Sequence, residues 1–492
     1  MNNELESRQL SRLSIFRNWL SLTGLVVVVA SLFSFLLLFV IDSLAHFANP
    51  YIGVLTYLVA PLFTVIGLIL TGLGAWRERR VLAKTKELAP AILIDLSRPR
   101  DRRIMGFFVA GSVVFLLITA MGSYHSYHFT ESVQFCGQAC HIVMQPELRT
   151  YQHGPHARVS CSECHIGPGA TWYVRSKLSG MYQVYATLAN KFPRPIPTPV
   201  RNLRPAQETC EQCHWPKKFV GNVERTYTHF LGEETNTVHT VRMLLKVGGA
   251  DPTHGPVGGI HWHMNVGNKV EYIAADESRQ KIPWIRFTDS QGVVTEFQTP
   301  DFTNGVKTAA IRLMDCMDCH NRPAHMLDSP NDAVDVAMGL HQIDAGLPWI
   351  KTNAVYALTR PYTNEVQALQ GIATFLANKH PGDPRVRQAI DTVQQIYKDN
   401  FFPEMKANWR VYPDNIGHKD WPGCFRCHDG NHKTADGQRT IKANDCNACH
   451  IILAQGRGAE LEQLTPQGQE FKHPGEDYEK GFLCSDCHTG GP

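Results

Sequence analysis

The fourteen cysteines of this 492-residue chain fall into seven close pairs, and a histidine follows the second cysteine of each pair. Six pairs have the pattern Cys-x-x-Cys-His, and the first pair has one additional residue between its cysteines. Two thiols at this separation can bond to the two vinyl groups of one porphyrin, and the adjacent histidine then faces the iron as its proximal ligand. The sequence therefore predicts seven covalently bound haem c groups. The attachment cysteines are Cys136 and Cys140, Cys161 and Cys164, Cys210 and Cys213, Cys316 and Cys319, Cys424 and Cys427, Cys446 and Cys449, and Cys484 and Cys487, followed by His141, His165, His214, His320, His428, His450 and His488.

Three other uses of paired cysteines compete with haem attachment. Disulfides are common outside the cytoplasm, but a disulfide framework does not place a histidine after every second cysteine. Zinc sites use Cys-x-x-Cys pairs without requiring an adjacent histidine. A thioredoxin-like motif is a single pair near a βαβ unit. Six matching motifs with no unpaired cysteine therefore favour haem.

Haems that only relay electrons carry a second axial ligand, usually a neutral histidine. Of the 23 histidines, 16 lie outside the seven signatures, so the supply exceeds the need. For each of them an ordinary surface or core histidine is the alternative, because ligation depends on proximity in space. Position in the sequence favours His156, His261, His263, His325, His418, His432 and His473.

Three uncharged apolar stretches precede the cysteines, at 19–41, 51–76 and 104–122. Each is long enough as a helix to cross roughly 30 Å of hydrocarbon. A buried core helix is the alternative for each, and a signal peptide for the first, although that stretch runs into Asp42 without a cleavage site. Basic residues crowd the N-terminus and the segment 77–103, whereas 42–50 has none. The positive-inside rule then places the N-terminus in the cytoplasm and everything after Gly122 in the periplasm, outside the inner membrane.

The formal net charge of +3 is that of the polypeptide alone. Seven haems would add two propionates each and bring the sum to roughly −11 when all are ionised. An acidic exported region favours basic soluble partners. We expect no nucleic-acid partner, because the basic segment 77–103 stands between two membrane spans.

Outside the lipid bilayer, the sequence predicts a mostly α and irregular multihaem cytochrome c fold with a small β insertion. We divide the chain into a membrane domain (1–122), a haem domain with three signatures (123–220), a β-rich insertion (221–315) and a C-terminal haem domain with four signatures (316–492). Alternating apolar and polar residues between Val238 and Phe297 predict short antiparallel strands. Apolar residues that recur at three and four positions predict two or three helices at 329–405, interrupted by Pro381 and Pro384.

The stretch from Gly122 to His214 resembles the NapC/NirT family of membrane-bound quinol dehydrogenases. An apolar stretch leads directly into a haem motif with a nearby methionine, and histidine-rich sequence leads into a second motif. The whole chain, with seven signatures, three spans and the run Cys-Phe-Arg-Cys-His-Asp-Gly-Asn-His at 424–432, resembles the heptahaem inner-membrane cytochromes of metal-respiring bacteria, of the ImcH type. In this family a methionine close after the first motif ligates the first haem, which implies Met144. Met144 stands three residues after His141 where the family usually has two, so both residues remain candidates.

The resemblance also implies a quinol site beside the first haem, with a lysine and, some six residues later, a carboxylate. Lys177 matches the lysine, but Gln183 occupies the acidic position, and a surface lysine is the alternative for Lys177. Quinol oxidation releases two protons that an amide cannot accept, so water, a propionate, His128 or another residue must take them. His125 and His128 are candidates for iron ligands or for the quinone entrance, whereas we do not expect His46 to be a ligand.

These features predict an inner-membrane enzyme that oxidises menaquinol and passes the electrons through seven haems to periplasmic multihaem cytochromes or reductases, in anaerobic or extracellular respiration. One alternative is a terminal reductase of a small oxyanion. It is disfavoured because the chain has no Cys-x-x-Cys-Lys motif and has a spare histidine for every haem. The other alternative is a passive haem-bearing anchor subunit of a partner enzyme.

Overall fold

The computed structural model divides into two compact units. The first comprises Met1–Cys136 and Cys161–Tyr182, and the second comprises Gly137–Ser160 and Gln183–Pro492. His46, Cys140 and the beginning of the second apolar stretch (51–59) lie outside the described residues. The structure describes residues 18–45, 60–85, 97–139, 141–200, 203–215, 219, 221–248, 258–265, 267–303, 305, 311–442, 446–475 and 482–491.

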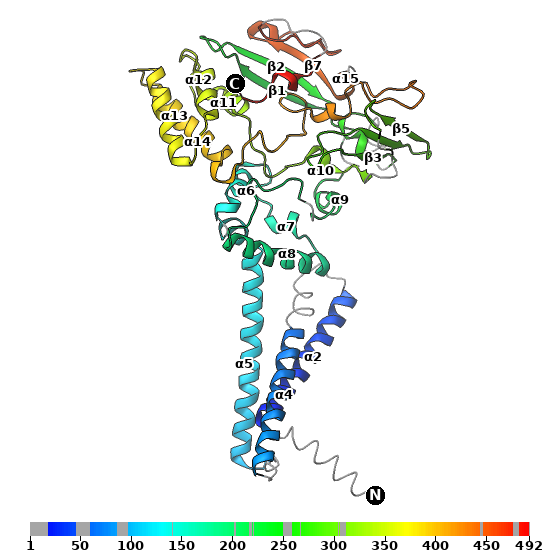
Figure 1. Cartoon of the computed structure of the whole chain (residues 1–492), viewed down its shortest axis with the longest axis vertical. Coiled ribbons are helices and arrows are strands. Elements are labelled where there is room, and N and C mark those ends of the chain that lie inside the picture. The colour runs from blue at the N-terminus through cyan, green and yellow to red at the C-terminus, as the bar shows by residue number, and fades with distance from the viewer. Residues whose placement is uncertain are drawn as a thin grey trace. The chain divides into compact units, whose positions relative to one another are not determined.

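Long helices occupy the described part of all three apolar stretches (Figure 1). They are α2 (Trp19–Ala45), α4 (Ala60–Thr85) and α5 (Pro99–Thr130). Among the described residues, Ala60–Val81 is the helical segment that is long and apolar enough to cross a membrane, and Trp19–Phe35 is a shorter apolar one. The helical structure of the stretches is as predicted, and their crossing of a bilayer stays a prediction.

Helices α2 and α4 pack against each other through small residues. A Cβ atom on Gly24 would lie 2.5 Å from the backbone nitrogen of Thr71, and one on Gly67 would also clash with α2. Seven residues further along α2, the hydroxyls of Ser31 and Thr64 are 2.8 Å apart. Residue numbers increase along α2 while the numbers of the residues that it contacts on α4 decrease, so the two helices are antiparallel. Small side chains and hydroxyl hydrogen bonds of this kind hold helices together in lipid, where apolar burial alone does not.

The second unit contains two antiparallel sheets. The first has the order β1-β2-β7, formed by Val223–Phe230, Val238–Leu245 and His450–Gly456. The second has the order β5-β4-β3-β6, formed by Val294–Gln298, Trp284–Thr288, Lys269–Ile273 and Arg312–Leu313. The predicted strands are present, but they belong to two sheets, and β7 comes from some 200 residues later in the chain. This strand begins at His450 of the sixth signature, which pairs with Leu245 of β2.

A helical subdomain follows the fourth signature. It contains α11 (Pro330–Gly339), α12 (Ile350–Thr359), α13 (Glu365–Lys379) and α14 (Val386–Asn400), so the segment has four helices where the sequence predicted two or three. Pro381 and Pro384 lie between α13 and α14, as expected. The core of this subdomain is fully buried and includes Val334, Ile350, Ile372, Leu376 and Val393.

The cysteine-containing segments form short helical turns that are connected by irregular chain. These are η2 (Gln134–Gln138), α7 (Cys161–His165), α9 (Ala206–Cys210), α10 (Cys316–Cys319), η7 (Gly423–Arg426), α15 (Cys446–Cys449) and α16 (Cys484–Cys487).

Candidate functional site: haem ligands and a lysine–glutamate pair

The haem signatures share one local geometry, a single helical turn closed by the histidine. The amide of His320 donates a hydrogen bond to the carbonyl of Cys316 at 2.8 Å, and His214 does the same to Cys210. This i to i+4 bond places the histidine over the first cysteine, and the two cysteines at i and i+3 share one face of the turn. The sequence spacing therefore presents two thiols and one imidazole together to a porphyrin.

The first signature accommodates its additional residue in a π-helical turn. η2 contains Cys136, and a π turn bonds i to i+5, one residue more than an α turn. Gly137 is buried against α6 (His141–His153), where a Cβ atom would lie 2.6 Å from a methyl group of Leu148. A larger residue at this position would therefore have to displace the Leu148 side chain.

The cysteines do not support the competing disulfide or zinc interpretations. No disulfide joins any of the 12 cysteines whose side chains the structure describes. Among the described residues, the one group that could hold a metal ion contains no cysteine and consists of His229, Asp332 and Asp335. Both carboxylates of that group already pair with lysines, Asp335 with Lys351 and Asp332 with Lys419.

Five pairs of described histidines are spaced as two ligands of one iron would be. An imidazole nitrogen binds a first-row metal at about 2 Å, so the centres of two rings on opposite sides of one iron lie roughly 6 Å apart. Each pair joins the histidine of one signature to a candidate second ligand, and the donor set fits a haem with two histidines. The ring centroids are 6.1 Å apart for His156 and His214, 6.3 Å for His261 and His320, 5.9 Å for His263 and His428, 6.2 Å for His418 and His450, and 5.9 Å for His473 and His488.

Backbone carbonyls fix the tautomer of four candidate second ligands. The Nδ1 atom of His261 donates to the carbonyl of Val247 at 2.8 Å, and a carbonyl can only accept. The Nε2 atom therefore keeps its lone pair for a metal, the arrangement usual for metal-binding histidines. The same anchoring joins His156 to Pro323, His263 to Ile260 and His325 to Glu147.

Burial keeps several of these imidazoles neutral. Loss of solvation lowers the pKa of His263, His418, His428 and His450 below the usual value for histidine. Neutral imidazole is the form that binds a metal, so these side chains are in the required state at neutral pH.

The surroundings of His432 do not favour its assignment as a ligand, which stays a prediction. Its side chain is fully buried, its Nδ1 atom lies 2.8 Å from a carboxylate oxygen of Asp429, and its Nε2 atom lies 2.6 Å from the carbonyl of Ile282. The carbonyl of Ile282 can only accept, so the Nε2 atom donates to it and does not offer a lone pair to iron. The residue instead ties the fifth signature to the second sheet.

Some candidate ligands reach signatures that are not their neighbours in the sequence, whereas His473 pairs with the signature that directly follows it. His156 precedes Cys161 by five residues but pairs with the third signature, and His418 precedes Cys424 by six but pairs with the sixth. One short 3-10 helix, η4 (Ile260–Met264), carries both His261 and His263 and so contributes to the fourth and fifth signatures. Met144 lies half-buried in the first turn of α6, and the choice between it and His141 stays a prediction.

Lys177 is bound to a carboxylate that sequence analysis did not single out. It lies on α8 (Ala170–Leu188), where its ammonium group contacts Glu131 Oε1 and lies 3.2 Å from the hydroxyl of Thr130. The same nitrogen lies 4.9 Å from the ring centroid of Tyr173. Glu131 follows the last residue of α5, and its side chain is only 9% exposed. The sequence does contain a signal, because Glu131 is the sole acidic residue between Asp101 and Glu147.

Burial raises the pKa of Glu131 above its usual range. Glu163 adds to this effect, and the adjacent Lys177 opposes it. Ser162 of the second signature donates to the backbone carbonyl of Glu131 at 3.3 Å, so the main chain at Glu131 is held beside that signature. Gln183, one and a half turns beyond Lys177 on α8, is exposed.

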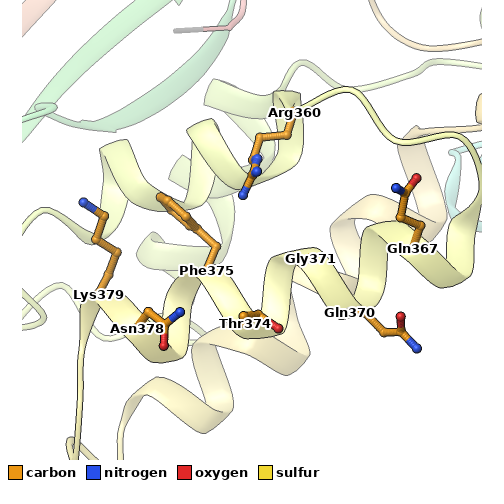
Figure 2. A pocket seen from close by; sticks show the side chains of 8 residues that line it. All are labelled: Arg360, Gln367, Gln370, Gly371, Thr374, Phe375, Asn378 and Lys379. Atoms are coloured by element: carbon orange, nitrogen blue, oxygen red, sulfur yellow. The ribbon is translucent and has the colours of Figure 1, made fainter.

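Two cavities lie on the second unit. The larger, about 550 Å³, lies on α13 and includes Arg360, Phe375 and Lys379 (Figure 2). It contains neither cysteine nor histidine, so it is unrelated to the predicted haems. The smaller, about 340 Å³, is lined by Gly137 and Gln138 of the first signature together with residues of α6.

Comparisons with known proteins agree with this arrangement. Residues 98–195, which contain the first two signatures and α8, match the N-terminal region of the NapC/NirT cytochrome c family. The chain is 42% identical over 490 residues to the cytochrome c-type protein ImcH of Geobacter sulfurreducens, an alignment that covers 96% of this chain and 95% of that protein. No solved structure matches the chain.

Proposed function

Because this chain belongs to the NapC/NirT cytochrome c family and is similar to ImcH over nearly its whole length, we propose that it is an inner-membrane quinol dehydrogenase. It oxidises menaquinol at the outer surface of the membrane. It then relays the electrons through seven c-type haems to periplasmic multihaem cytochromes or reductases.

The five histidine pairs carry this proposal. Haem iron supplies one-electron redox chemistry when it is bound, and two histidine ligands leave the iron no open position for a substrate. The chain's own contribution is to fix both imidazoles and to keep them neutral. An arrangement of this kind suits a relay and disfavours the terminal reductase, which needs an open iron.

Neighbouring signatures are physically connected, as a relay requires. The thiols of Cys210 and Cys316, from the third and fourth signatures, lie within hydrogen-bonding distance of each other. The guanidinium of Arg426, inside the fifth signature, donates to the carbonyl of Asp318, inside the fourth, at 2.6 Å. The carboxylate of Asp318 is buried and accepts from Tyr272 at 2.6 Å, which fixes the fourth signature to the second sheet.

The membrane half of the proposal rests on α2, α4, α5 and the surface of α8. We infer that the first three helices cross the inner membrane, with the N-terminus in the cytoplasm, as the distribution of basic residues indicates. α8 exposes an apolar stripe at helical spacing, and such a stripe fits a membrane surface, where a lipid-soluble quinol is available. The stripe consists of Val174, Leu178, Met181, Tyr185 and Leu188.

Lys177 is the proposed quinol-binding residue. Its ammonium group is a third exposed and already makes hydrogen bonds to oxygen, so a quinol oxygen can take the place of the Thr130 hydroxyl. We propose Gln183, on the same helix, as a neighbour of the quinol rather than as a proton acceptor, because its amide cannot accept a proton.

The test is to add a menaquinol analogue to the purified haem-loaded protein and to measure how many haems become reduced, relative to dithionite. We expect reduction of most haems, and a rate at least roughly tenfold lower in Lys177→Ala, because a charge-assisted hydrogen bond is lost. Lys191→Ala removes an exposed lysine three residues after the end of α8, and it should leave the rate of haem reduction by quinol unchanged. If quinol does not reduce the wild-type protein, quinol oxidation is excluded and the passive anchor subunit becomes the better hypothesis. If a haem binds an added oxyanion, the terminal reductase becomes the better hypothesis.

A further inference from the structure

Quinol oxidation at Lys177 needs a proton acceptor, and the residue at the family's acidic position cannot be one. A quinol gives up two protons for every two electrons, and Gln183 has only an amide to offer. Resting on the proposed function above, we infer that Glu131 accepts the quinol protons in this chain and passes them to the outside.

The geometry of the lysine–glutamate pair supports this role. The Lys177 ammonium group contacts both Thr130 and Glu131, so a quinol oxygen held by the lysine comes next to the Glu131 carboxylate. A general base must lie within hydrogen-bond reach of the proton that it takes. The backbone carbonyl of Glu131 accepts a hydrogen bond from Ser162, and the charge of Glu163 acts on the Glu131 carboxylate, so this residue lies beside the second signature, on the side of the electron acceptor.

Glu131 is better placed than the other groups near Lys177. Glu163 is exposed and belongs to the interior of the second signature, and His128 is exposed on α5. The phenol of Tyr173 is buried, and burial and the Glu131 charge raise its pKa, so it holds its proton and cannot accept another. Among the described residues around Lys177, only Glu131 combines contact with the lysine, burial and a carboxylate whose pKa is raised.

The overall step balances as follows. One quinol becomes one quinone and loses two electrons and two protons. The electrons go singly to ferric haem c of the adjacent signatures, which is the oxidant. Each hydroxyl proton moves in turn to a carboxylate oxygen of Glu131, which releases the first proton to outside water before it accepts the second. Lys177 keeps its charge throughout and holds the quinol oxygen.

The pH dependence has a defined sign. The groups that face Glu131 are Lys177 and Tyr173 from α8 and Glu163 from α7, while Cys136 and Cys161 cease to titrate once bonded to haem. Acceptance of a proton requires the ionised carboxylate, so the rate of quinol oxidation should rise with pH through the titration of Glu131. The raised pKa moves this rise toward neutral pH.

The experiment compares Glu131→Gln, Glu131→Asp and the neighbouring charge control Glu163→Gln in the haem-loaded protein. Position 163 tolerates change in principle, because the six Cys-x-x-Cys-His motifs carry different residues between their cysteines. Loss of a general base lowers a rate by about 10²–10⁴-fold, so Glu131→Gln should slow quinol-driven haem reduction by about a hundredfold or more. Reduction by dithionite should be unchanged, and Glu131→Asp should recover part of the rate with a shifted pH profile. Glu163→Gln should keep the rate of the wild type on the plateau at high pH, with the rise displaced to lower pH, because the Glu163 charge helps to raise the pKa of Glu131.

A binding measurement gives a readout that is independent of turnover. Fluorescence titration with a hydroxyquinoline N-oxide inhibitor, an anion at high pH, should show affinity that falls as Glu131 ionises in the wild type and in Glu163→Gln. This fall should be absent in Glu131→Gln, even though the inhibitor still binds.

Each outcome decides one of the two proposals. A wild type that is not reduced by quinol overturns the proposed function, and this inference falls with it. An active wild type whose Glu131→Gln variant retains its rate and its pH profile overturns only the role of Glu131. If Glu131→Gln lacks haem, Glu131→Asp decides, because an unchanged pH profile in that variant contradicts the inference.

Discussion

Replacing the two histidines of η4, singly and together, should change the spin state of a countable number of haems. His261 and His263 stand two residues apart, but their rings pair with histidines of different signatures, at 6.3 Å from His320 and 5.9 Å from His428. If the two histidines are ligands as proposed, each replacement by alanine would take one ligand from one haem, and that haem would become high-spin. One of the seven haems should become high-spin in each single variant, and two in the double variant.

Spin-resonance and optical spectra of the oxidised protein measure this fraction, with total haem determined on the same sample. His341→Asn is the control, because His341 is exposed and its backbone has a φ of 58°, a left-handed conformation that asparagine tolerates. This variant should contain the same number of high-spin haems as the wild type.

The count itself can refute the ligand assignment. If both histidines served one iron, the double variant would contain one high-spin haem, not two. If neither were a ligand, all three variants would resemble His341→Asn. A replacement at one position that converts two haems would mean that η4 has a structural effect beyond ligation.

Three further predictions concern stability. Gly67→Val should lower the thermal midpoint of the protein in detergent by overpacking against Val28, at a cost of about 1–3 kcal/mol, whereas Gly72→Val on the same helix meets open space and should not. Burial raises the pKa of Asp414 to about 6, above the unfolded value of roughly 4. The ionised form therefore destabilises the fold by up to about 2 kcal/mol at pH 7, so Asp414→Asn should raise the thermal midpoint at pH 7 and not at pH 4. His432→Ala should cost about 2–4 kcal/mol by leaving buried acceptors unpaired, without adding high-spin haem, and a high-spin signal would return His432 to the ligands.

Features that depend on neighbouring residues could be predicted from the sequence. The spacing of Cys316, Cys319 and His320 determines a single turn, and that turn is present. The apolar stretches are helical wherever they are described, because their length and composition suffice for a helix. The segment 330–400 has four helices and not two or three, because α11 and α12 have only ten residues each, too few for apolar periodicity alone to separate them from irregular chain.

Features that depend on contacts between distant parts of the chain could not be predicted from the sequence. The partner of His156 lies 58 residues away in a signature that is not its neighbour, and nothing local encodes that choice. His432 has the same position relative to its signature as a ligand would, yet the carbonyl of Ile282 occupies its Nε2 atom. The role proposed for Glu131 could have been suspected from its isolation among apolar residues, but its contact with Lys177 depends on how α8 packs at the end of α5.

Pairing between a candidate ligand near one signature and the histidine of another signature would help to hold the haem region together. A distal histidine that belongs to the neighbourhood of one signature but faces another makes each haem a covalent and coordinative link between two segments. Hydrophobic clusters in this region are small, such as the one formed by Val270, Tyr272, Ile282 and Ile285, whereas the large fully buried core belongs to the helical subdomain. Three such links, made by His156, His263 and His418, would therefore supply much of the cohesion that side chains do not. The order of the signatures along the relay and the fold of the chain would then be determined by the same contacts.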